Sequence, residues 1–202
     1  MNNLSHPYCK YVASIADKND VDKLYHDNHY GVRIESDDEL LCRLVMEINQ
    51  AGLSWRTILK KEQGLRSAYD NFDIKKVAMY NEKDFARLMN DPGIIRNKLK
   101  IHAAIYNAQQ IIKLQKEFGS FRKWLDIQSG VILSSIGDSG LDSRAGGNDN
   151  AEPREISKSA WLKLFKKHFK FVGGEIVGEF LMSIDILSGS HDARCKVRFM
   201  LK

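Results

Sequence analysis

The sequence predicts an all-α protein, and three observations support this fold class. The 202 residues include only 3 prolines, which is few for a turn-dense β-sandwich. Apolar residues recur at helical spacing in several segments. No segment alternates apolar and polar residues for long enough to predict a half-buried strand. Helices joined by turns are therefore the expected architecture.

Length and composition limit the class of protein further. A chain of 202 residues suits one compact domain, and we expect a single domain over residues 1–202 with two helical lobes. Hydrophobic residues make up 43% and charged residues 28% of the chain, as in folded globular proteins rather than disordered ones. No apolar run approaches the roughly 18 residues that cross a bilayer. An integral membrane protein is excluded, and the first ten residues do not suggest a secretory signal.

Cysteine number and charge suggest a compartment and a partner. The 3 cysteines cannot form a disulfide framework, which suits a reducing cytoplasm. The formal net charge is +5, and the surplus of lysine and arginine lies in the last quarter of the chain. A basic segment can attract a polyanion such as DNA, although it is often only a solvated surface.

Capping residues and apolar spacing place the helices. Ser36 and Glu39 predict a capping box, and the helix that follows carries Leu40, Leu44 and Ile48 on one face before Gly52 ends it. The further predicted helices are one from Ser54 with Trp55, Ile58 and Leu59; a short one around Phe85, Leu88 and Met89; a long one with Ile101, Ala104, Ala108 and Ile111; a short one with Phe121, Trp124 and Leu125; and two over 157–168 and 174–187. The change to Gly, Ser, Asp and Asn predicts a flexible loop over about 134–152.

A helix, a tight turn and a second helix are expected around Gly93. A glycine there lets backbone amides of the turn and of the next helix approach a phosphate. Arg96, Lys98 and Lys100 follow directly and would add positive charge at the same place. A DNA-gripping helix-hairpin-helix and a plain helix–helix turn both explain these residues, and the pattern leaves both open.

Glu47 is the strongest candidate for chemistry from pattern alone. It lies at the edge of the apolar stripe of its helix, and burying an unpaired carboxylate is costly. It therefore either meets a cation within the protein or serves a binding site. Trp55 and the nearby tyrosines could form aromatic walls, and an acid between such walls suits a planar cationic ligand.

Two cysteines and two histidines form a candidate metal set. His191 and Cys195 lie four residues apart, and one helical turn would aim both side chains at the same ion. Cys9 and His26 would complete a Cys₂His₂ set and tie the two ends of the chain together, although their spacing fits no common zinc finger. Cys42, on an apolar helix, is better explained as a core thiol.

With these residues assembled, the chain resembles the family of bacterial 3-methyladenine DNA glycosylases I. The matching runs are Tyr25-His26-Asp27-Asn28, Gly31-Val32, Glu47, Gln50-Ala51-Gly52-Leu53-Ser54-Trp55, Leu59-Lys60-Lys61, Gly93-Ile94-Ile95-Arg96, Lys166-Lys167, Phe169-Lys170-Phe171-Val172-Gly173 and His191-x-x-x-Cys195. They occur in family order and extend over nearly the whole chain. Residues 134–152 match poorly.

The resemblance implies the fold, the activity and the residues that carry it. The fold would be that of the helix-hairpin-helix glycosylases, with a structural Zn²⁺ bound by Cys9, His26, His191 and Cys195. Glu47 would recognise the base edge, Tyr25 would be the pocket tyrosine, Trp55 would stack on the base, and Leu53 would fill the gap left by the flipped nucleotide. The DNA contacts expected at the hairpin are Gly93, Ile94, Arg96 and Lys98. The substrate would be alkylated double-stranded DNA, bound by a monomer.

Several departures from the family pattern keep other functions open. Tyr11 and Tyr30 occupy pocket positions that are usually Trp, and His29 replaces the usual Glu. Residues from Asn97 to Lys116 include no acid, which fits a cationic lesion that leaves easily, and Asn97 stands where strand-cutting relatives have lysine. We therefore expect a monofunctional enzyme. The alternatives are a non-catalytic lesion-binding paralogue and a glycosylase for another alkylated purine.

Overall fold

The computed structural model describes residues 4–138 and 158–199, and every regular element in these ranges is a helix. The predicted all-α class is confirmed. The α-helices are α1 (Pro7–Ala13), α2 (Val21–Asn28), α3 (Asp37–Gln50), α4 (Trp55–Ala68), α5 (Ile74–Ala78), α6 (Glu82–Asn90), α7 (Lys98–Phe118), α8 (Phe121–Asp138), α9 (Lys158–His168) and α10 (Gly174–Ser183), and the 3₁₀ helices are η1 (Asp70–Phe72) and η2 (Lys196–Phe199). None of the helices searched has the length and apolar character to span a bilayer.

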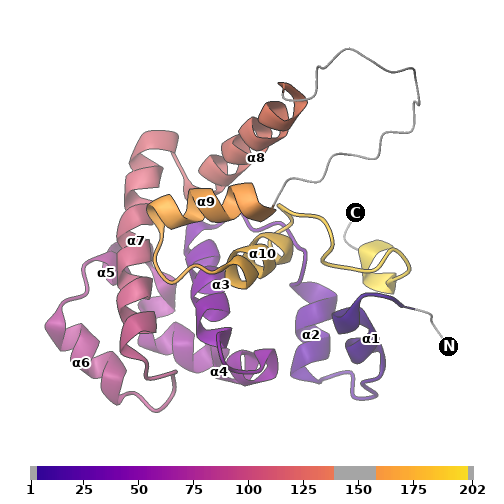
Figure 1. The fold of residues 1–202 in the computed structure, drawn as a ribbon. Helices are drawn as coiled ribbons and strands as arrows, with labels where there is room; N and C mark the ends of the chain where they lie inside the picture. The colour runs from indigo at the N-terminus through magenta and orange to yellow at the C-terminus, as the bar shows by residue number, and fades with distance from the viewer. Residues whose placement is uncertain (1–3, 139–157, 200–202) are drawn as a thin grey trace.

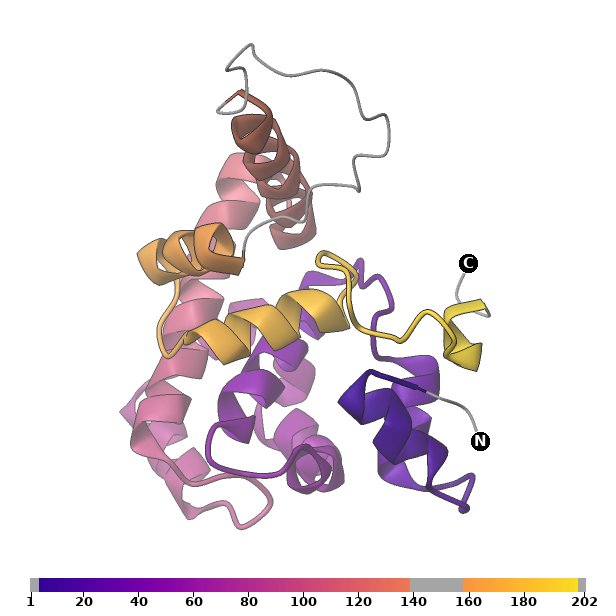
Figure 2. The ribbon, with the colours of Figure 1, turned by 45° about the vertical axis from the view of Figure 1, so that its right-hand side comes forward.

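Helix α3 forms the centre of the molecule. It contacts α4, α5, α7, α8, α10 and η1, and its residues from Leu40 to Asn49 are all buried. The long helix α7 runs beside it, α10 packs on it, and α9 lies next to α10 (Figure 1). Helices α1 and α2 lie at one side of this body, where α2 contacts α4, next to the C-terminal segment (Figure 2).

Both ends of α3 are set by local chemistry. The Ser36 hydroxyl accepts a hydrogen bond from the Glu39 amide at 3.4 Å, but the predicted capping box is only half formed. The Glu39 carboxylate instead accepts two hydrogen bonds from Arg66, at 2.8 and 2.7 Å, because a bidentate guanidinium is the stronger partner. The helix stops before Gly52, whose φ of 83° lies in the left-handed region.

Several helix boundaries differ from those predicted. Helix α8 continues to Asp138, so the first residues of the predicted loop over 134–152 are helical, and the remainder of that loop lies outside the described residues. Helix α10 ends at Ser183, four residues earlier than predicted. The short helices α1, α2 and α5 were not anticipated because each buries few residues and so carries little periodic signal.

The predicted helix, turn and second helix are present as α6, residues 91–97 and α7, and the glycine of this turn, called the hairpin here, serves packing. The Gly93 amide donates to the Asp91 carboxylate at 2.6 Å, so this amide is already engaged. A Cβ added at Gly64 would lie 2.5 Å from the Gly93 carbonyl oxygen, which shows how closely the turn approaches α4. Asn97 then caps α7 by accepting from the amides of Leu99 and Lys100.

Lys100 does not contribute surface charge at the hairpin, contrary to the prediction. It is 5% exposed, and its Nζ donates to the carbonyl oxygens of Asn49 at 2.9 Å and Ala51 at 2.7 Å. These carbonyls belong to the C-terminal end of α3, where a positive charge is favourable. Lys100 therefore joins the hairpin to the turn between α3 and α4.

The two ends of the chain are held together. The Asp192 carboxylate accepts hydrogen bonds from the amide and the hydroxyl of Ser5, both at 2.6 Å. A Cβ at Gly31 would lie 2.4 Å from the Ser190 hydroxyl oxygen, so only glycine allows the C-terminal segment to pass α2 this closely. Cys9 and Cys195 are buried in a small cluster with Leu4 and Val197.

Candidate active site

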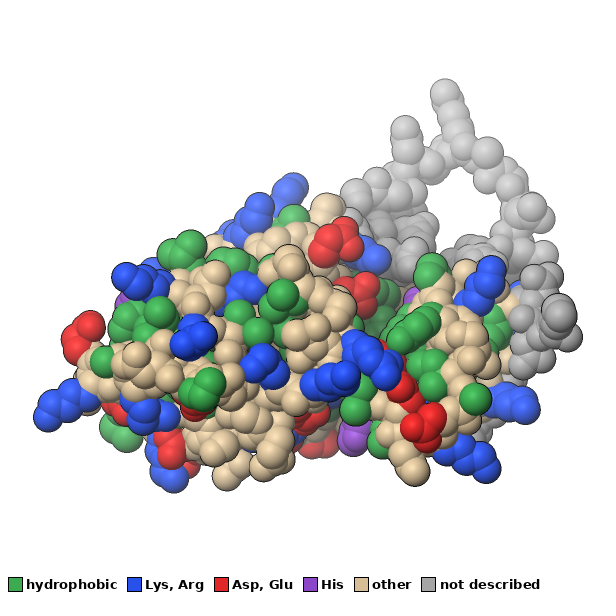
Figure 3. Space-filling view, turned by 90° about the horizontal axis from the view of Figure 1, so that it is seen from below, with side chains coloured by type: hydrophobic (Ala, Val, Ile, Leu, Met, Phe, Trp, Pro, Cys, Tyr) green, Lys and Arg blue, Asp and Glu red, His purple; other side chains and the backbone are tan. Residues whose placement is uncertain are grey.

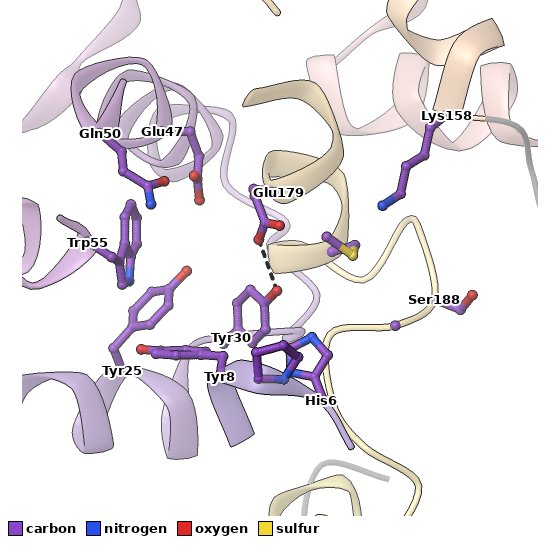
Figure 4. A pocket seen from close by; sticks show the side chains of 13 residues that line it. His6, Tyr8, Tyr25, Tyr30, Glu47, Gln50, Trp55, Lys158, Glu179 and Ser188 are labelled. Carbon is purple, nitrogen blue, oxygen red and sulfur yellow. Dashed lines mark hydrogen bonds between the residues drawn. The ribbon is translucent and has the colours of Figure 1, made fainter. Parts of the chain in front are cut away.

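A cavity of about 540 Å³ opens between α1, α2, α3 and α10. Its size is within the range of small-molecule sites. Figure 4 shows its side chains converging from both halves of the sequence. It is lined by His6, Pro7, Tyr8, Tyr25, Tyr30, Glu47, Gln50, Trp55, Lys158, Glu179, Met182, Ser188 and Gly189.

Glu47 lies on α3 in the wall of this cavity and is only 3% exposed. Burial raises the pKa of its carboxyl to about 8. The positive charge of Arg43 opposes this rise, and the negative charge of Glu179 adds to it. No side chain in the described part of the chain donates a hydrogen bond to it. At neutral pH the free protein therefore holds Glu47 mostly protonated, whereas the sequence suggested a carboxylate. A cationic ligand would restore the ionised form.

Tyr25 and Trp55 form the aromatic walls beside Glu47. Their ring centroids are 5.0 Å apart at an interplanar angle of 61°. The Tyr25 hydroxyl accepts a hydrogen bond from Arg43 Nη1 at 2.8 Å. Trp55 Nε1 is buried and has no hydrogen-bond partner in the structure. An orphaned buried donor costs free energy unless a ligand or water meets it.

Tyr30 lies in the cavity as predicted, but Tyr11 does not. Tyr11 is 45% exposed, and its hydroxyl meets Asp22 at 3.3 Å and Arg56 at 3.3 Å. It lies on the outer face of α1 because the helix turns Tyr8 inward instead. The Tyr8 ring packs edge-on against Tyr30, with centroids 5.5 Å apart.

Sequence reasoning missed several cavity residues, and Glu179 is the most informative of them. It comes from α10, where it is a single acid among the apolar residues Val177, Phe180 and Leu181. That is the same signal that identified Glu47. Tyr8 and Lys158 carry no comparable pattern, since only the fold brings them to the cavity.

The residues expected to meet DNA lie beyond the cavity. Leu53 is 41% exposed in the turn between α3 and α4, and Arg96 and Lys98 are exposed at the hairpin. Ile94 is 3% exposed, so its side chain belongs to the core and only its backbone could contact DNA. Figure 3 shows the underside of the molecule, where lysine and arginine side chains lie among apolar ones.

Cys9, His26, His191 and Cys195 come together at the chain ends. One ligand atom from each lies within 4.8 Å of the others. His26 Nε2 is 3.4 Å from Cys9 Sγ and 3.8 Å from Cys195 Sγ, and His191 Nδ1 is 3.9 Å from Cys9 Sγ. A tetrahedral zinc with ordinary bond lengths has S···N edges of about 3.5 Å. The donor set therefore fits such an ion.

The second nitrogen of each histidine has its own partner. His26 Nδ1 lies 2.8 Å from the Asp27 carboxylate, and His191 Nε2 lies 2.8 Å from the Tyr30 carbonyl oxygen. Such contacts orient imidazole ligands around a metal. The segment from His191 to Cys195 is a turn closed by the Cys195 amide on Asp192 O at 2.9 Å, not the helical turn expected from the spacing.

Fold and site together define an all-helical protein with an acidic, aromatic cavity for a flat ligand. The methyladenine glycosylase family model matches residues 15–199. The chain belongs to this family.

Curated relatives and solved structures agree with the family model. DNA-3-methyladenine glycosylase 1 of Escherichia coli is 33% identical over 172 residues, which cover 81% of this chain and 84% of the relative. DNA-3-methyladenine glycosylase of Haemophilus influenzae is 29% identical, over 85% and 90% of the two chains. The structure of 3-methyladenine DNA glycosylase I from Staphylococcus aureus superposes with a TM-score of 0.72 at 28% identity, and covers 95% of this chain and 96% of its own.

Proposed function

We propose that this chain flips 3-methyladenine out of alkylated double-stranded DNA and hydrolyses its N-glycosidic bond, leaving an abasic site. A base inside a duplex cannot be reached, so the enzyme must extrude it into a pocket. Membership of the methyladenine glycosylase family supports this activity. One observation assigns this activity to the cavity. Glu47 is buried there beside two aromatic rings and receives no hydrogen bond from the described residues.

The cavity side chains can bind a flat cation. Ionised Glu47 would accept hydrogen bonds from the adenine edge, and the positive base would favour that ionised form. Trp55 and Tyr25 would add π faces, which attract cations. Tyr25, whose hydroxyl is fixed by Arg43, would add a hydrogen bond. The role of these residues is to recognise the base and to leave a protected route for the water molecule that attacks the sugar, because a cationic base is already a good leaving group.

The position shortly after the hairpin glycine, where strand-cutting relatives have a lysine, supports a monofunctional reaction. Asn97 stands at the corresponding position after the hairpin glycine and caps α7 with its side chain. Lys98 is exposed, and Lys100 is buried against two carbonyl oxygens. Borohydride trapping on abasic DNA tests this proposal. We expect no covalent adduct, and an adduct that disappears in Lys98→Ala would show that the enzyme is bifunctional.

DNA would be held mainly through its backbone at the α6–α7 hairpin, in the manner of the helix-hairpin-helix superfamily. Exposed Arg96 and Lys98 would neutralise phosphates, and Leu53 would enter the gap left by the extruded nucleotide. Because such contacts release counterions, affinity should fall steeply with salt. One site is built within one chain, so we propose a monomer. A single domain acting in the cytoplasm agrees with the three buried free cysteines.

We propose that Cys9, His26, His191 and Cys195 hold a structural zinc ion. Four protein ligands leave no open position for a water molecule, so the ion would stabilise the fold rather than take part in the reaction. The paired second nitrogens of both histidines support this proposal. Metal analysis of the reduced, purified protein should find about one zinc per chain.

One assay tests the activity against both alternatives. DNA carrying 3-methyladenine, 7-methylguanine and 3-methylguanine is incubated with the protein, and free bases are separated and counted. We expect preferential release of 3-methyladenine, reduced by about 100-fold or more in Glu47→Gln and Trp55→Ala. Binding without release would favour the lesion-binding paralogue. Preferential release of 7-methylguanine would favour the glycosylase for another purine.

A further inference from the structure

The cavity contains a second acid. Glu179 lies on α10, and its Oε2 accepts a hydrogen bond from the Tyr30 hydroxyl at 3.1 Å. Within the described ranges this is the single hydrogen bond of its carboxylate, so Oε1 stays available to the cavity. Figure 4 shows Glu47 and Glu179 both directed toward the tyrosine rings of the cavity.

The two acids differ in their surroundings. Glu47 is 3% exposed and receives no hydrogen bond from the described residues, and its pKa of about 8 keeps it mostly neutral at pH 7. Glu179 is only partly buried and has the Tyr30 hydroxyl as a donor, which stabilises negative charge. The Coulombic effect of Glu179 is one cause of the raised pKa of Glu47. Of the two acids, Glu179 is therefore the one that a donor of the protein holds in place, with its second oxygen available to the cavity.

No lysine or arginine in the described ranges forms an ion pair with Glu179. Lys158 lines the cavity but is exposed, and it makes no ion pair within 4 Å among the residues described. Arg43 lies behind Tyr25, with its Cζ 4.8 Å from the ring centroid. The pKa values of Tyr25 and Tyr30 are raised, mainly by burial, so both phenols stay neutral.

We propose that Glu179, positioned by Tyr30, is a specificity-determining residue that selects positively charged alkylated purines over neutral bases. The inference rests on the proposed glycosylase function and names the charge class of its substrate. A cation that loses its water in the cavity regains a favourable interaction with the Glu179 carboxylate. A neutral base gains no such interaction and leaves the carboxylate partly desolvated. The carboxylate therefore increases the difference in binding free energy between a cationic and a neutral ligand, and this difference is the specificity.

Two ligands of nearly the same shape test the proposal. The 3,9-dimethyladeninium ion carries a fixed positive charge, whereas free 3-methyladenine is mostly neutral at pH 7.5. Binding of each is measured by quenching of tryptophan fluorescence. Glu179→Gln keeps an acceptor for Tyr30 and removes the charge. We expect its affinity for the cation to fall by about 10-fold and its affinity for the neutral base to change by less than about 2-fold.

Two more variants separate charge from packing. Glu175→Gln changes a fully exposed acid on the same helix and should leave both affinities unchanged. Tyr30→Phe keeps the ring but releases Glu179, and should reduce the preference for the cation by a smaller factor. A fall of both affinities by the same factor in Glu179→Gln would overturn the proposal and leave Glu179 a packing role.

Base release separates the inference from the function on which it rests. If the unaltered protein releases no methylated base from DNA, the glycosylase function itself is wrong, whatever the variants bind. If it releases 3-methyladenine while Glu179→Gln keeps the full preference for the cation, the function stands and the role of Glu179 is wrong.

Discussion

The Cys/His cluster and the cavity both bury polar groups, and the molecule treats these groups in opposite ways. In the Cys/His cluster the second nitrogen of each histidine has a partner, Asp27 for His26 and the Tyr30 carbonyl for His191. In the cavity, Glu47 receives no hydrogen bond from the described residues, and Trp55 Nε1 has no partner. Unpaired buried groups cost stability. In the cavity a ligand can supply the missing partner, so the cluster should govern folding and the cavity should govern substrate binding.

The largest expected effect is on stability, from loss of a ligand in the Cys/His cluster. Cys195→Ser should abolish metal binding and lower the free energy of unfolding by more than about 4 kcal/mol, because a metal that ties the chain ends is bound by the folded state alone. A strong chelator added to the unaltered protein should act in the same direction. Urea unfolding and metal content, measured on the same sample, check both.

Cys42→Ala is the matched control for a buried thiol outside the cluster. Cys42 is 1% exposed on α3, and burial raises the pKa of its thiol to about 12, as expected of an unreactive core residue. The variant should lose about 1 kcal/mol and keep its full metal content. An equal loss of stability in both cysteine variants would contradict a special role for the cluster.

The second effect is a pH dependence of stability that originates in the cavity. Burial raises the pKa of Glu47 to about 8 from its ordinary value of 4.5, so the folded protein keeps a proton that the unfolded chain has released between these pH values. The free energy of unfolding should therefore fall as pH rises through this window. Relative to Glu47→Gln, the fall should be about 2 to 4 kcal/mol. Urea unfolding of both proteins at pH 5, 6, 7 and 8 measures it, and parallel profiles would refute the assignment.

The sequence predicted the buried acid of α3 because a charge in an apolar stripe is visible in one helix. The same signal at Glu179 was available but was overlooked. Tyr8 could not be distinguished from Tyr11 by sequence, since the choice between them depends on how α1 docks on α2. Cys9 and Cys195 were grouped by residue type alone, and the family resemblance supplied the assignment as zinc ligands, because nothing local brings residues so distant in sequence together. Lys100 was expected at the surface because the carbonyl oxygens that accept its hydrogen bonds belong to the end of α3, about 50 residues earlier, and only the fold brings them to it.

The third effect concerns the contact between the α6–α7 hairpin and the turn between α3 and α4. Lys100→Met removes a buried ammonium that donates to the carbonyl oxygens of Asn49 and Ala51. We expect a loss of about 2 kcal/mol in the free energy of unfolding and a fall in base release, because the turn that carries Leu53 loses its anchor. Lys98→Met, an exposed neighbour, should weaken DNA binding without a measurable change in stability. Similar unfolding curves for the two variants would show that Lys100 does not anchor the turn.

The smallest effect compares a tyrosine inside the cavity with one outside it. Tyr11→Phe removes an exposed hydroxyl that meets Asp22 and Arg56, and should change stability by less than about 0.5 kcal/mol and base release by less than about 2-fold. Tyr25→Phe removes a hydroxyl that is fixed by Arg43 within the cavity, and should slow release by about 10-fold. Single-turnover release of 3-methyladenine measures both. Because each variant loses one hydroxyl and keeps its ring, a larger effect of Tyr11→Phe would place the base on the outer face of α1 and not in the cavity.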